Sequence, residues 1–456
     1  MFYDTSMKYA RFLIILLVSW SVSFAVVRAE TPDPCALISE EIIDLLPPEF
    51  DKALRFKRTY GVEGLDQAVK ILPLADLGFV VVGMTSPVTR SPQATQELIE
   101  APPTLYLNRH DKTGKLIWET RHPIKDLKRV ADAVVIKDQI FIAADIQGSD
   151  ISSVLLYTVD GLGKKIKEDK IRSSKNSLSA RAMVGHGSSI ILAVSSQSLK
   201  KDAVSTTRII KQSLNGKTIF NRDYLADIPS RIEGLKRMPD NSIIAVGRAR
   251  ISGSRMGGWI LRISDKGDII ASDLFPRGRQ ASLNSIDVLT DGSFITAGEV
   301  IGSNMGADMA AWVMRLPAQS VTPLWQSYIK GSYAYEGLKV LPLSDGRVQI
   351  LLAAKAVTTK ESAGRDHGHV LTYTAEGRMV DVESFIEGSN ARPRDLVQHS
   401  EFRILAGQAQ TGFSNASHDS LAYRSTYDVW VAGLPVPKPV ASLCASPAIN
   451  MSLSDE

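Results

Sequence analysis

Short β-rich runs, many of them mainly apolar, recur along most of the chain, and each run ends at a cluster of turn residues. Between residues 282 and 329 four such runs follow one another, separated by an Asp-Gly pair, a loop rich in Gly and Asn, and a turn that begins with Pro. Runs of this length, bounded by Gly, Pro, Asn or Asp, indicate β-strands. The pattern therefore predicts a unit of four short strands.

The same unit recurs along the chain. The stretch DGSFITAGEV at residues 291–300 has counterparts in DNSIIAVGRA, ADLGFVVVGM and EFRILAGQAQ. Gly247 and Gly298 occupy equivalent places 51 residues apart. Aligning the units divides the chain at 60–125, 126–176, 177–228, 229–281, 282–334, 335–390 and 391–443.

Four strands in each repeat of about 50 residues are typical of a β-propeller. A β-solenoid would use shorter repeats, a pair of β-sandwiches would not keep the period, and the repeats lack the helical periodicity of an α/β barrel. We therefore predict an all-β fold, a seven-bladed β-propeller with four-stranded blades over residues 53–443. The first unit is longer because residues 90–103 are inserted, and we expect this insert to form a surface loop.

Tryptophan recurs at fixed places in the repeat. Trp259, Trp312 and Trp430 fall at one place in the third strands, and Trp118 and Trp325 at one place in the fourth. Large apolar side chains that recur in this way are expected to pack between neighbouring units rather than to bind a ligand.

The last unit supplies only three strands before the Pro-rich residues 435–440. A further strand at residues 53–59 precedes the first unit, and we expect it to complete the last blade as its outer strand. Such closure would bring the chain ends together and favour a Cys35–Cys444 disulfide, worth ~5 kcal/mol on the entropy model. Two unrelated free thiols are the alternative, because spacing alone does not fix pairing.

The N-terminus has the pattern of a signal peptide. A basic start, an apolar run at residues 12–27 and the small-residue sequence VRA predict a signal peptide over residues 1–29. A retained membrane anchor is the alternative, although the run of about 16 residues is short for a span of ~20. We therefore expect an exported protein, periplasmic or extracellular.

Two short segments flank the repeats. The sequence CALISEEIIDLLPPEFDKAL has apolar residues at helical spacing, so residues 30–52 are expected to be a helical segment. Residues 444–456 are expected to form a C-terminal tail.

The turn and strand DGSFITAG, the later AWVMRL and the strand LWQSYI resemble the blade repeats of bacterial secreted propellers of the PQQ-like and BamB-like types. The resemblance covers about residues 53–443 and implies blade architecture rather than an activity. The Trp-docking signature of PQQ dehydrogenases is not clear, and the chain has no vicinal Cys pair. We therefore expect no cofactor.

The charge of the chain is small for its length. The net charge is +4 over 456 residues, and removal of residues 1–29 would lower it to +2. Acidic and basic residues are mixed, and the chain has no basic block. This balance excludes electrostatic capture of nucleic acid.

Aligning the first strands places one polar residue at the same position in every unit. Because inner strands line the tunnel of a propeller, we expect these residues to ring its mouth and to bind a polar small molecule, a sugar or a peptide. A solvated ring of mutually neutralising charges without a ligand is the alternative. The predicted ring consists of Gln67, Asp132, Arg181, Glu233, Asn284, Glu336 and Arg394.

Other candidate metal-binding, catalytic and phosphate-binding motifs give weaker evidence for a site. His367 and His369 share one face of a strand, but Asp366 would point elsewhere, so we predict no metal site. The chain has no GxSxG sequence, and turns such as DKTGK are not phosphate loops, because no helix follows them. Asn415 and Asn450 begin glycosylation sequons, which matter only in a host that glycosylates.

These features favour an exported binding or scaffold protein, monomeric, that presents rim loops and a polar tunnel mouth to a protein or glycan partner. A propeller-type enzyme, either a quinoprotein-like dehydrogenase or a carbohydrate-active hydrolase or lyase, is the alternative. A membrane-tethered assembly factor that retains residues 12–27 is a third reading, and membrane association is expected only in that case.

Overall fold

The computed structural model describes most of the region that carries the repeats. All described residues belong to one compact unit, Leu37–Ser442. They contain no helix, and therefore none long and apolar enough to cross a membrane. The expected signal peptide, both cysteines and the two sequons lie outside them. The described residues are 39–45, 54–61, 64–90, 98–100, 102–200, 203–302, 309–320, 322–357, 365–399, 402–413 and 425–437.

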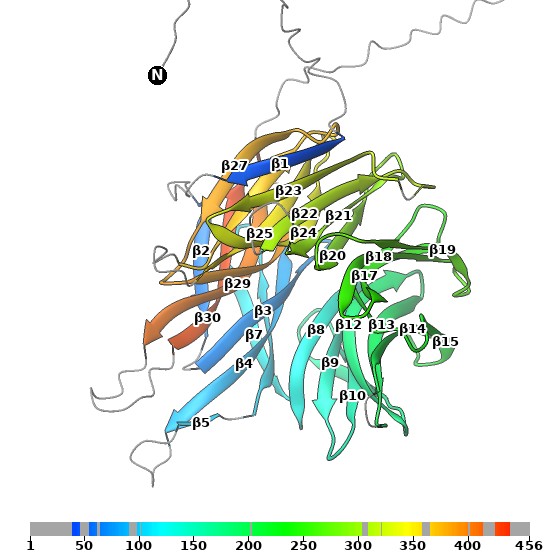
Figure 1. Cartoon of the computed structure of the whole chain (residues 1–456). Helices are drawn as coiled ribbons and strands as arrows, with labels where there is room; N and C mark the ends of the chain where they lie inside the picture. The colour runs from blue at the N-terminus through cyan, green and yellow to red at the C-terminus, as the bar shows by residue number, and fades with distance from the viewer. Residues whose placement is uncertain are drawn as a thin grey trace, which may run out of the picture. The chain divides into compact units, whose positions relative to one another are not determined.

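The predicted all-β class is confirmed, since the strands of the described residues pair into five sheets (Figure 1). Three of these sheets are four-stranded antiparallel meanders, in which each strand pairs with the next along the chain. They comprise β8 (Leu127–Ile136), β9 (Gln139–Gln147), β10 (Ser152–Val159) and β11 (Lys165–Ile171); β12 (Asn176–His186), β13 (Ser189–Ser198), β14 (Ser205–Ser213) and β15 (Thr218–Tyr224); and β24 (Tyr333–Pro342), β25 (Val348–Ala356), β26 (His367–Tyr373) and β27 (Met379–Phe385).

The other two sheets are nine-stranded, and each contains two groups of four antiparallel strands joined through a single bridging pair, Met256 with Gln280 or Leu65 with Tyr427. We call these groups meanders as well, although one of them takes its fourth strand from the N-terminal part of the chain. One contains β16 (Ser230–Arg237), β17 (Ile243–Ser252), β18 (Arg255–Ile263), β19 (Ile269–Phe275), β20 (Gln280–Val288), β21 (Phe294–Ile301), β22 (Met309–Leu316), β23 (Trp325–Gly331) and β1 (Glu40–Leu45). The other contains β3 (Gly64–Pro73), β4 (Phe79–Arg90), β5 (Leu98–Glu100), β6 (Thr104–His110), β7 (Leu116–Pro123), β28 (Ala391–Gln398), β29 (Phe402–Phe413), β30 (Ser425–Pro435) and β2 (Phe56–Tyr60).

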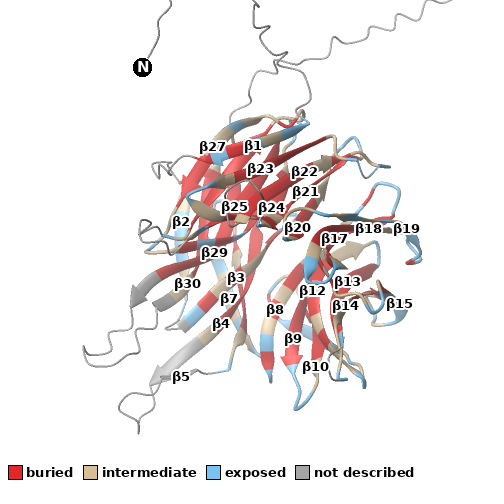
Figure 2. Ribbon diagram, in the orientation of Figure 1, coloured by how far each residue is buried: buried red, intermediate tan, exposed pale blue. Residues whose placement is uncertain are grey.

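The first strand of every meander, from β3 to β28, lines the same central channel. Successive meanders pack face to face around it, so the described residues form a β-propeller, as predicted. Burial follows this arrangement: the middle strands are buried, whereas outer strands such as β15 and β19 are largely exposed (Figure 2).

The recurring tryptophans pack between successive meanders, which confirms the expectation from the sequence. Trp312 on β22 belongs to a buried cluster with Val246 and Ile260 of the preceding meander. Trp325 on β23 stacks on Tyr373 of the following one, with ring centroids 5.5 Å apart. These contacts give each meander an apolar face against its neighbours, which is the main stabilising term of such a fold.

Asp291 and Arg315, both in the fifth repeat, form a polar link to the next meander. Asp291 accepts hydrogen bonds from the backbone N–H and the hydroxyl of Ser293, which fixes the turn before β21. Arg315 on β22 pairs with the same carboxylate at 2.7 Å and donates to the backbone carbonyl of Ala375 in the next meander. The repeat therefore encodes a polar link between blades as well as a turn.

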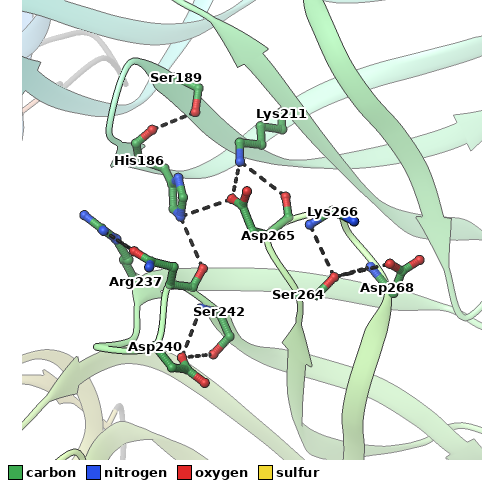
Figure 3. A network of polar contacts seen from close by, with 11 residues as sticks. His186, Ser189, Lys211, Arg237, Asp240, Ser242, Ser264, Asp265, Lys266 and Asp268 are labelled. Carbon is green, nitrogen blue, oxygen red and sulfur yellow. Dashed lines mark hydrogen bonds and ion pairs between the residues drawn. The ribbon is translucent and has the colours of Figure 1, made fainter.

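A related link joins the third and fourth meanders along the chain (Figure 3). Lys211 on β14 reaches both the carboxylate and the carbonyl of Asp265, in the turn between β18 and β19. His186 approaches the same carboxylate at 3.3 Å and the carbonyl of Asn241 at 3.2 Å. Because its groups are paired with one another across two meanders, this network has a structural role.

A β-bulge interrupts the first strand of every meander at an equivalent place. One residue is skipped in the pairing with the second strand, and a bulge re-aims the side chains beside it. The skipped residues are Val69, Ala131, Arg181, Glu233, Asn284, Leu338 and Arg394.

The repeated glycine of the second strand lies against this bulge. A Cβ at Gly298 would lie 1.9 Å from the carbonyl oxygen of Ser282, and a Cβ at Gly247 would lie 1.9 Å from that of Arg231. A side chain at either place would therefore force the two strands apart. Val194 fills the equivalent place on β13, so the bulge does not require glycine in every unit.

Strand β2 pairs antiparallel with β30, as predicted for the strand expected at residues 53–59. Phe56 on β2 packs against Gly114, in the turn between β6 and β7, where a Cβ would lie 2.6 Å from the ring. Trp325 has the same relationship to Gly377, in the turn of the meander that follows its own. Phe56 thus occupies the place that a fourth-strand aromatic takes elsewhere in the fold.

The helix expected within residues 30–52 is wrong over Glu40–Leu45, which forms strand β1 and pairs in parallel with β23. Ile43 and Leu45 are buried whereas Ile42 is half exposed, an alternation with a period of two. The free edge of β23 supplies backbone partners that an isolated short helix would lack. Residues 30–38 and 46–52 lie outside the described residues.

The insert at residues 90–103, expected as a surface loop, is partly a strand. Strand β5 pairs antiparallel with the end of β4, with Thr89 opposite Ile99. The second strand of this meander therefore extends into an additional hairpin, whose residues 91–97 lie outside the described part.

Candidate functional site: the mouth of the central channel

The central channel encloses a cavity of about 460 Å³ bounded by the first strand of every meander. Bulged residues line one end of it, and residues such as Lys236 and Asp287, three positions later in their strands, line the other. We call the end with the bulged residues the channel mouth. It collects charged side chains from the first and second strands of several meanders.

The structure brings most of the predicted ring together. Asp132, Arg181, Glu233, Asn284 and Arg394 all line the cavity. All but Asp132 stand at the bulge itself, and Asp132 follows it by one residue.

Gln67 and Glu336 do not line this cavity, because each precedes its bulge by two residues. Glu336 instead lines an adjoining cavity of about 250 Å³, together with Lys355 and Arg394. The predicted ring therefore combines residues from three different positions relative to the bulge: two before it, at it and one after it.

Below the mouth, Asp132 and Asp395 tie neighbouring first strands together. Asp132 accepts the backbone N–H of Met183 at 2.8 Å, and Asp395 accepts that of Ile71 at 2.9 Å. Although burial alone would lower it, the charges of Asp132 and Asp395 raise the pKa of Lys70. These carboxylates are occupied by structural hydrogen bonds and ion pairs, which leaves them poorly placed for catalysis.

One side of the mouth is rich in arginine. Arg231 on β16 and Arg248 on β17 are direct cross-strand partners, and Arg231 forms an ion pair with Glu233. Arg181 on the neighbouring β12 donates from Nε to the hydroxyl of Ser195 at 2.8 Å. Burial and the charge of Arg231 lower the pKa of Arg181 to about 10 and also lower that of Arg248. These guanidinium groups are thus partly removed from water and repel one another.

The adjacent side of the mouth carries two carboxylates around one amide. Asn284 donates from Nδ2 to Glu299 at 2.6 Å and lies 3.5 Å from an oxygen of Glu336. Lys355 forms an ion pair with Glu336. Burial and the neighbouring charge of Glu336 raise the pKa of Glu299 to about 7. Glu299 can therefore exchange a proton near neutral pH.

Arg394 stands between the two cavities and lines both. Desolvation by the surrounding protein lowers the pKa of the Arg394 guanidinium, although part of the side chain remains exposed. The charge of Glu336 acts on it in the opposite direction. The wall on this side is completed by Arg392, which pairs with Asp366 at 2.9 Å.

Arg231, Arg248, Glu299 and Lys355 were not among the predicted site residues. Arg248 and Glu299 directly follow the repeated glycine in AVGR and TAGE, where the first unit has Met84. A charged residue at this place in an otherwise apolar strand is the signal that could have indicated Arg248 and Glu299.

His367 and His369 are buried and bonded to each other rather than arranged around a metal. Their Nε2 atoms lie 3.0 Å apart, His367 Nδ1 faces the carbonyl of Arg365, and His369 Nδ1 faces the hydroxyl of Ser384. Only one pattern of neutral tautomers satisfies all three contacts: Ser384 donates to His369, His369 to His367, and His367 to the carbonyl. Within the described residues no group of three potential ligands for a metal occurs.

No protein-family model and no curated protein matches the chain. Solved structures with some likeness include a protein of unknown function from Dyadobacter fermentans, at 10% identity and a TM-score of 0.43, over 84% of this chain and 98% of that one. A neuraminidase-like protein of subtype N11 from a flat-faced bat influenza A virus is 7% identical, with a TM-score of 0.45, over 89% of this chain and 98% of that one. The WD40 domain of Neurospora crassa Pan2 is 12% identical, with a TM-score of 0.42, over 86% and 99%. At TM-scores below 0.5, these likenesses carry no argument about this chain.

Proposed function

We propose that this protein is an exported, seven-bladed β-propeller that binds a protein or glycan partner at the channel mouth. The blade number is supported by the two nine-stranded sheets, each of which contains two meanders joined by one residue pair. Together with the three separate meanders, they supply one meander among the described residues for each of the seven proposed blades. The packing of Phe56 on Gly114 supports closure of the last blade by β2.

The observation that carries the binding proposal is the composition of the mouth. Charged side chains from β12, β16 and β28 line the main cavity, and those from β24 and β25 line the adjoining one. The charges of Arg248 on β17 and Glu299 on β21 interact with this group. Concave sites with a few convergent polar groups are where proteins usually bind ligands. Burial lowers the pKa of Arg181 to about 10 and also lowers that of Arg394, which supports a partly enclosed site over a ring of fully solvated charges.

Export and the Cys35–Cys444 disulfide belong to the same proposal. The apolar run at residues 12–27 and the presence of only two cysteines, at opposite ends of the expected mature chain, support both. Mass spectrometry of the purified mature protein would detect a new N-terminus after residue 29 and a mass lower by two hydrogens for the disulfide. An intact N-terminus with two free thiols would contradict both.

The binding proposal is tested by affinity capture from the native cell envelope and by a glycan panel, using the mature protein as bait. The variants Glu336→Ala and Arg394→Ala each remove one charged side chain from the mouth. Glu168→Ala is the matched control, since Glu168 lies on the outer strand β11 and pairs with Lys165. We expect the two mouth variants to lose the captured partner or glycan and the control to keep it. Unchanged binding by folded mouth variants would contradict the proposal.

A second candidate, a carbohydrate-active hydrolase or lyase, is favoured by Glu299 and Glu336. Two carboxylates beside one amide, one of them with a pKa of about 7, are a combination that glycosidic bond cleavage can use. Release of reducing ends from an oligosaccharide, lost in Glu299→Gln, would establish this activity. Binding without turnover would leave the protein as a receptor or scaffold.

A further inference from the structure

The arginine side of the mouth holds more positive charge than its own acidic groups neutralise. Arg231 forms an ion pair with Glu233, and the charge of the same carboxylate acts on Arg181 and Arg248. The charge of Glu299 also acts on Arg248, but that carboxylate accepts the hydrogen bond from Asn284. Three guanidinium groups therefore share one acidic partner of their own.

The pair Arg129 and Asp145 lies next to this cluster without changing its balance. The two side chains are 2.9 Å apart, and Asp145 also accepts the backbone N–H of Ala180 at 2.7 Å. The charges of Arg129 and Asp145 therefore neutralise each other and leave the net charge of the arginine cluster unchanged.

Several donors of the arginine cluster have no protein partner. Arg248 forms no hydrogen bond or ion pair within the described residues, and Arg181 uses only its Nε. A guanidinium carries five N–H donors in a planar fork that suits two oxygens of one acid group. The cluster therefore offers donors of the right geometry to a group from outside.

The electrostatic repulsion within the arginine cluster also favours a bound anion. Like charges directly opposite each other on an antiparallel pair are destabilising, and Arg231 and Arg248 stand in that relationship. Partial burial adds to the penalty, because it weakens hydration of both groups. A negatively charged group bound among them would neutralise the excess charge and use the free donors.

We propose that Arg181, Arg231 and Arg248 form a subsite for an anionic group of the ligand, a carboxylate or a phosphate. The inference rests on the proposed binding function and specifies its chemistry. On a glycan partner the group would be a uronic acid or a phosphorylated sugar. The neighbouring Asn284, Glu299 and Glu336 then face the remainder of the ligand and suit its hydroxyl groups.

Isothermal titration calorimetry of the mature protein tests this subsite with three probes: inorganic phosphate, glucuronate and neutral glucose. The variants are Arg181→Gln, Arg248→Gln and the double variant that carries both substitutions. Arg208→Gln is the matched control, because Arg208 lies on β14, outside the channel wall, and pairs with Asp223 at 2.7 Å. Thermal unfolding without a probe establishes that each variant is folded.

We expect at least one of the two anions to bind, with a dissociation constant on the order of 1 mM for a single small group. Each single variant should weaken that binding about tenfold or more, the combined variant should abolish it, and Arg208→Gln should leave it unchanged. Binding of phosphate alone identifies a phosphate-bearing ligand, and binding of glucuronate alone identifies a carboxylate.

The inference is overturned if neither anion binds, or if the folded combined variant binds it as tightly as the unmodified protein. These failures differ from failure of the proposed function. A neutral glycan captured through Glu336 would preserve the mouth as a binding site while removing the anionic subsite. Loss of both the anion and every captured partner would remove both proposals.

Discussion

Arg231 and Arg248 face each other directly across strands β16 and β17, at the level where the bulge at Glu233 opens the first strand toward the channel. Among the described residues, the other charged pairs directly opposite each other on paired strands are of opposite sign, as in Arg129 with Asp145 and Arg208 with Asp223. A like-charged pair is unfavourable for the folded sheet. Under the proposed function this cost belongs to the binding site, since sites for ligands commonly lower stability.

Replacing Arg248 by Met should therefore stabilise the unliganded protein. We expect the free energy of unfolding to rise by about 0.5–1 kcal/mol, because the repulsion from Arg231 disappears and the apolar stem is retained. Urea denaturation at neutral pH measures the change. Arg208→Met, which breaks an exposed ion pair, should be neutral or slightly destabilising. A loss of stability in Arg248→Met would mean that this arginine has a structural role.

The repeated glycine can be tested at Gly298. Gly298→Ala should lower the free energy of unfolding by about 3 kcal/mol, because the new Cβ would collide with the carbonyl of Ser282. Gly161→Ala is the control, since its Cβ would meet only the carbonyl of Asp138 at an ordinary 3.7 Å. Equal stability of the two variants in denaturant titrations would refute the close approach.

Closure of the ring by β2 can be tested at Phe56. Phe56→Ala should cost about 2–3 kcal/mol, because the ring packs on Gly114 and lies 5.3 Å from that of Phe402. Amide exchange should accelerate first in β30, the pairing partner of β2. Ile270→Ala, on the exposed outer strand β19, should change stability by no more than about 0.5 kcal/mol. Exchange that stays slow in β30 would show that β2 does not close the last blade.

The buried histidine pair predicts a specific dependence on pH. Burial lowers the pKa of His369 to about 3 and also lowers that of His367. Between pH ~6.5 and ~3 the unfolded chain therefore binds more protons than the folded one, and stability is lost as the pH falls through this window. We expect His369→Gln to reduce the loss between pH 7 and pH 4.5 by about 2 kcal/mol, measured by urea unfolding at both pH values.

His186→Gln is the control for this experiment, because His186 belongs to the separate network around Asp265. An equal change of slope in both variants would assign the acid sensitivity to groups other than the buried pair.

The sequence was sufficient for the fold class and for much of the strand order. In the sequence, each meander corresponds to apolar runs separated by turn residues. Asp291 and Gly292 form the turn where they were expected. The pairing of β2 with β30 followed from counting strands in the last unit. Local patterns were enough within the meanders because successive strands pair with one another, whereas the β2–β30 pairing required a count of strands over all the repeats.

The channel wall was harder to predict, because a bulge changes which residues face inward. A single extra residue shifts the register, so Gln67 and Glu336 were aligned two positions away from Val69 and Leu338, which stand at the bulge. The carboxylate of Glu299 was missed for another reason. It lies on a second strand, and only the fold brings it beside Glu336.

Strand β1 was mistaken for part of a helix because its apolar residues fit both periods. The sequence EEIIDL places Ile43 and Leu45 two apart, as in a strand, but the longer stretch around it also has helical spacing. The deciding factor is the open edge of β23, about 285 residues further along the chain, which no local pattern contains.

Hydrogen–deuterium exchange, with and without a saturating captured partner or glycan, tests most directly the claim that the mouth is the binding site. We predict protection of backbone amides at residues 179–183, 231–234, 297–300 and 334–338, with no change in the outer strands β11, β15 and β19. Protection confined to the outer strands, with the mouth unchanged, would contradict the account.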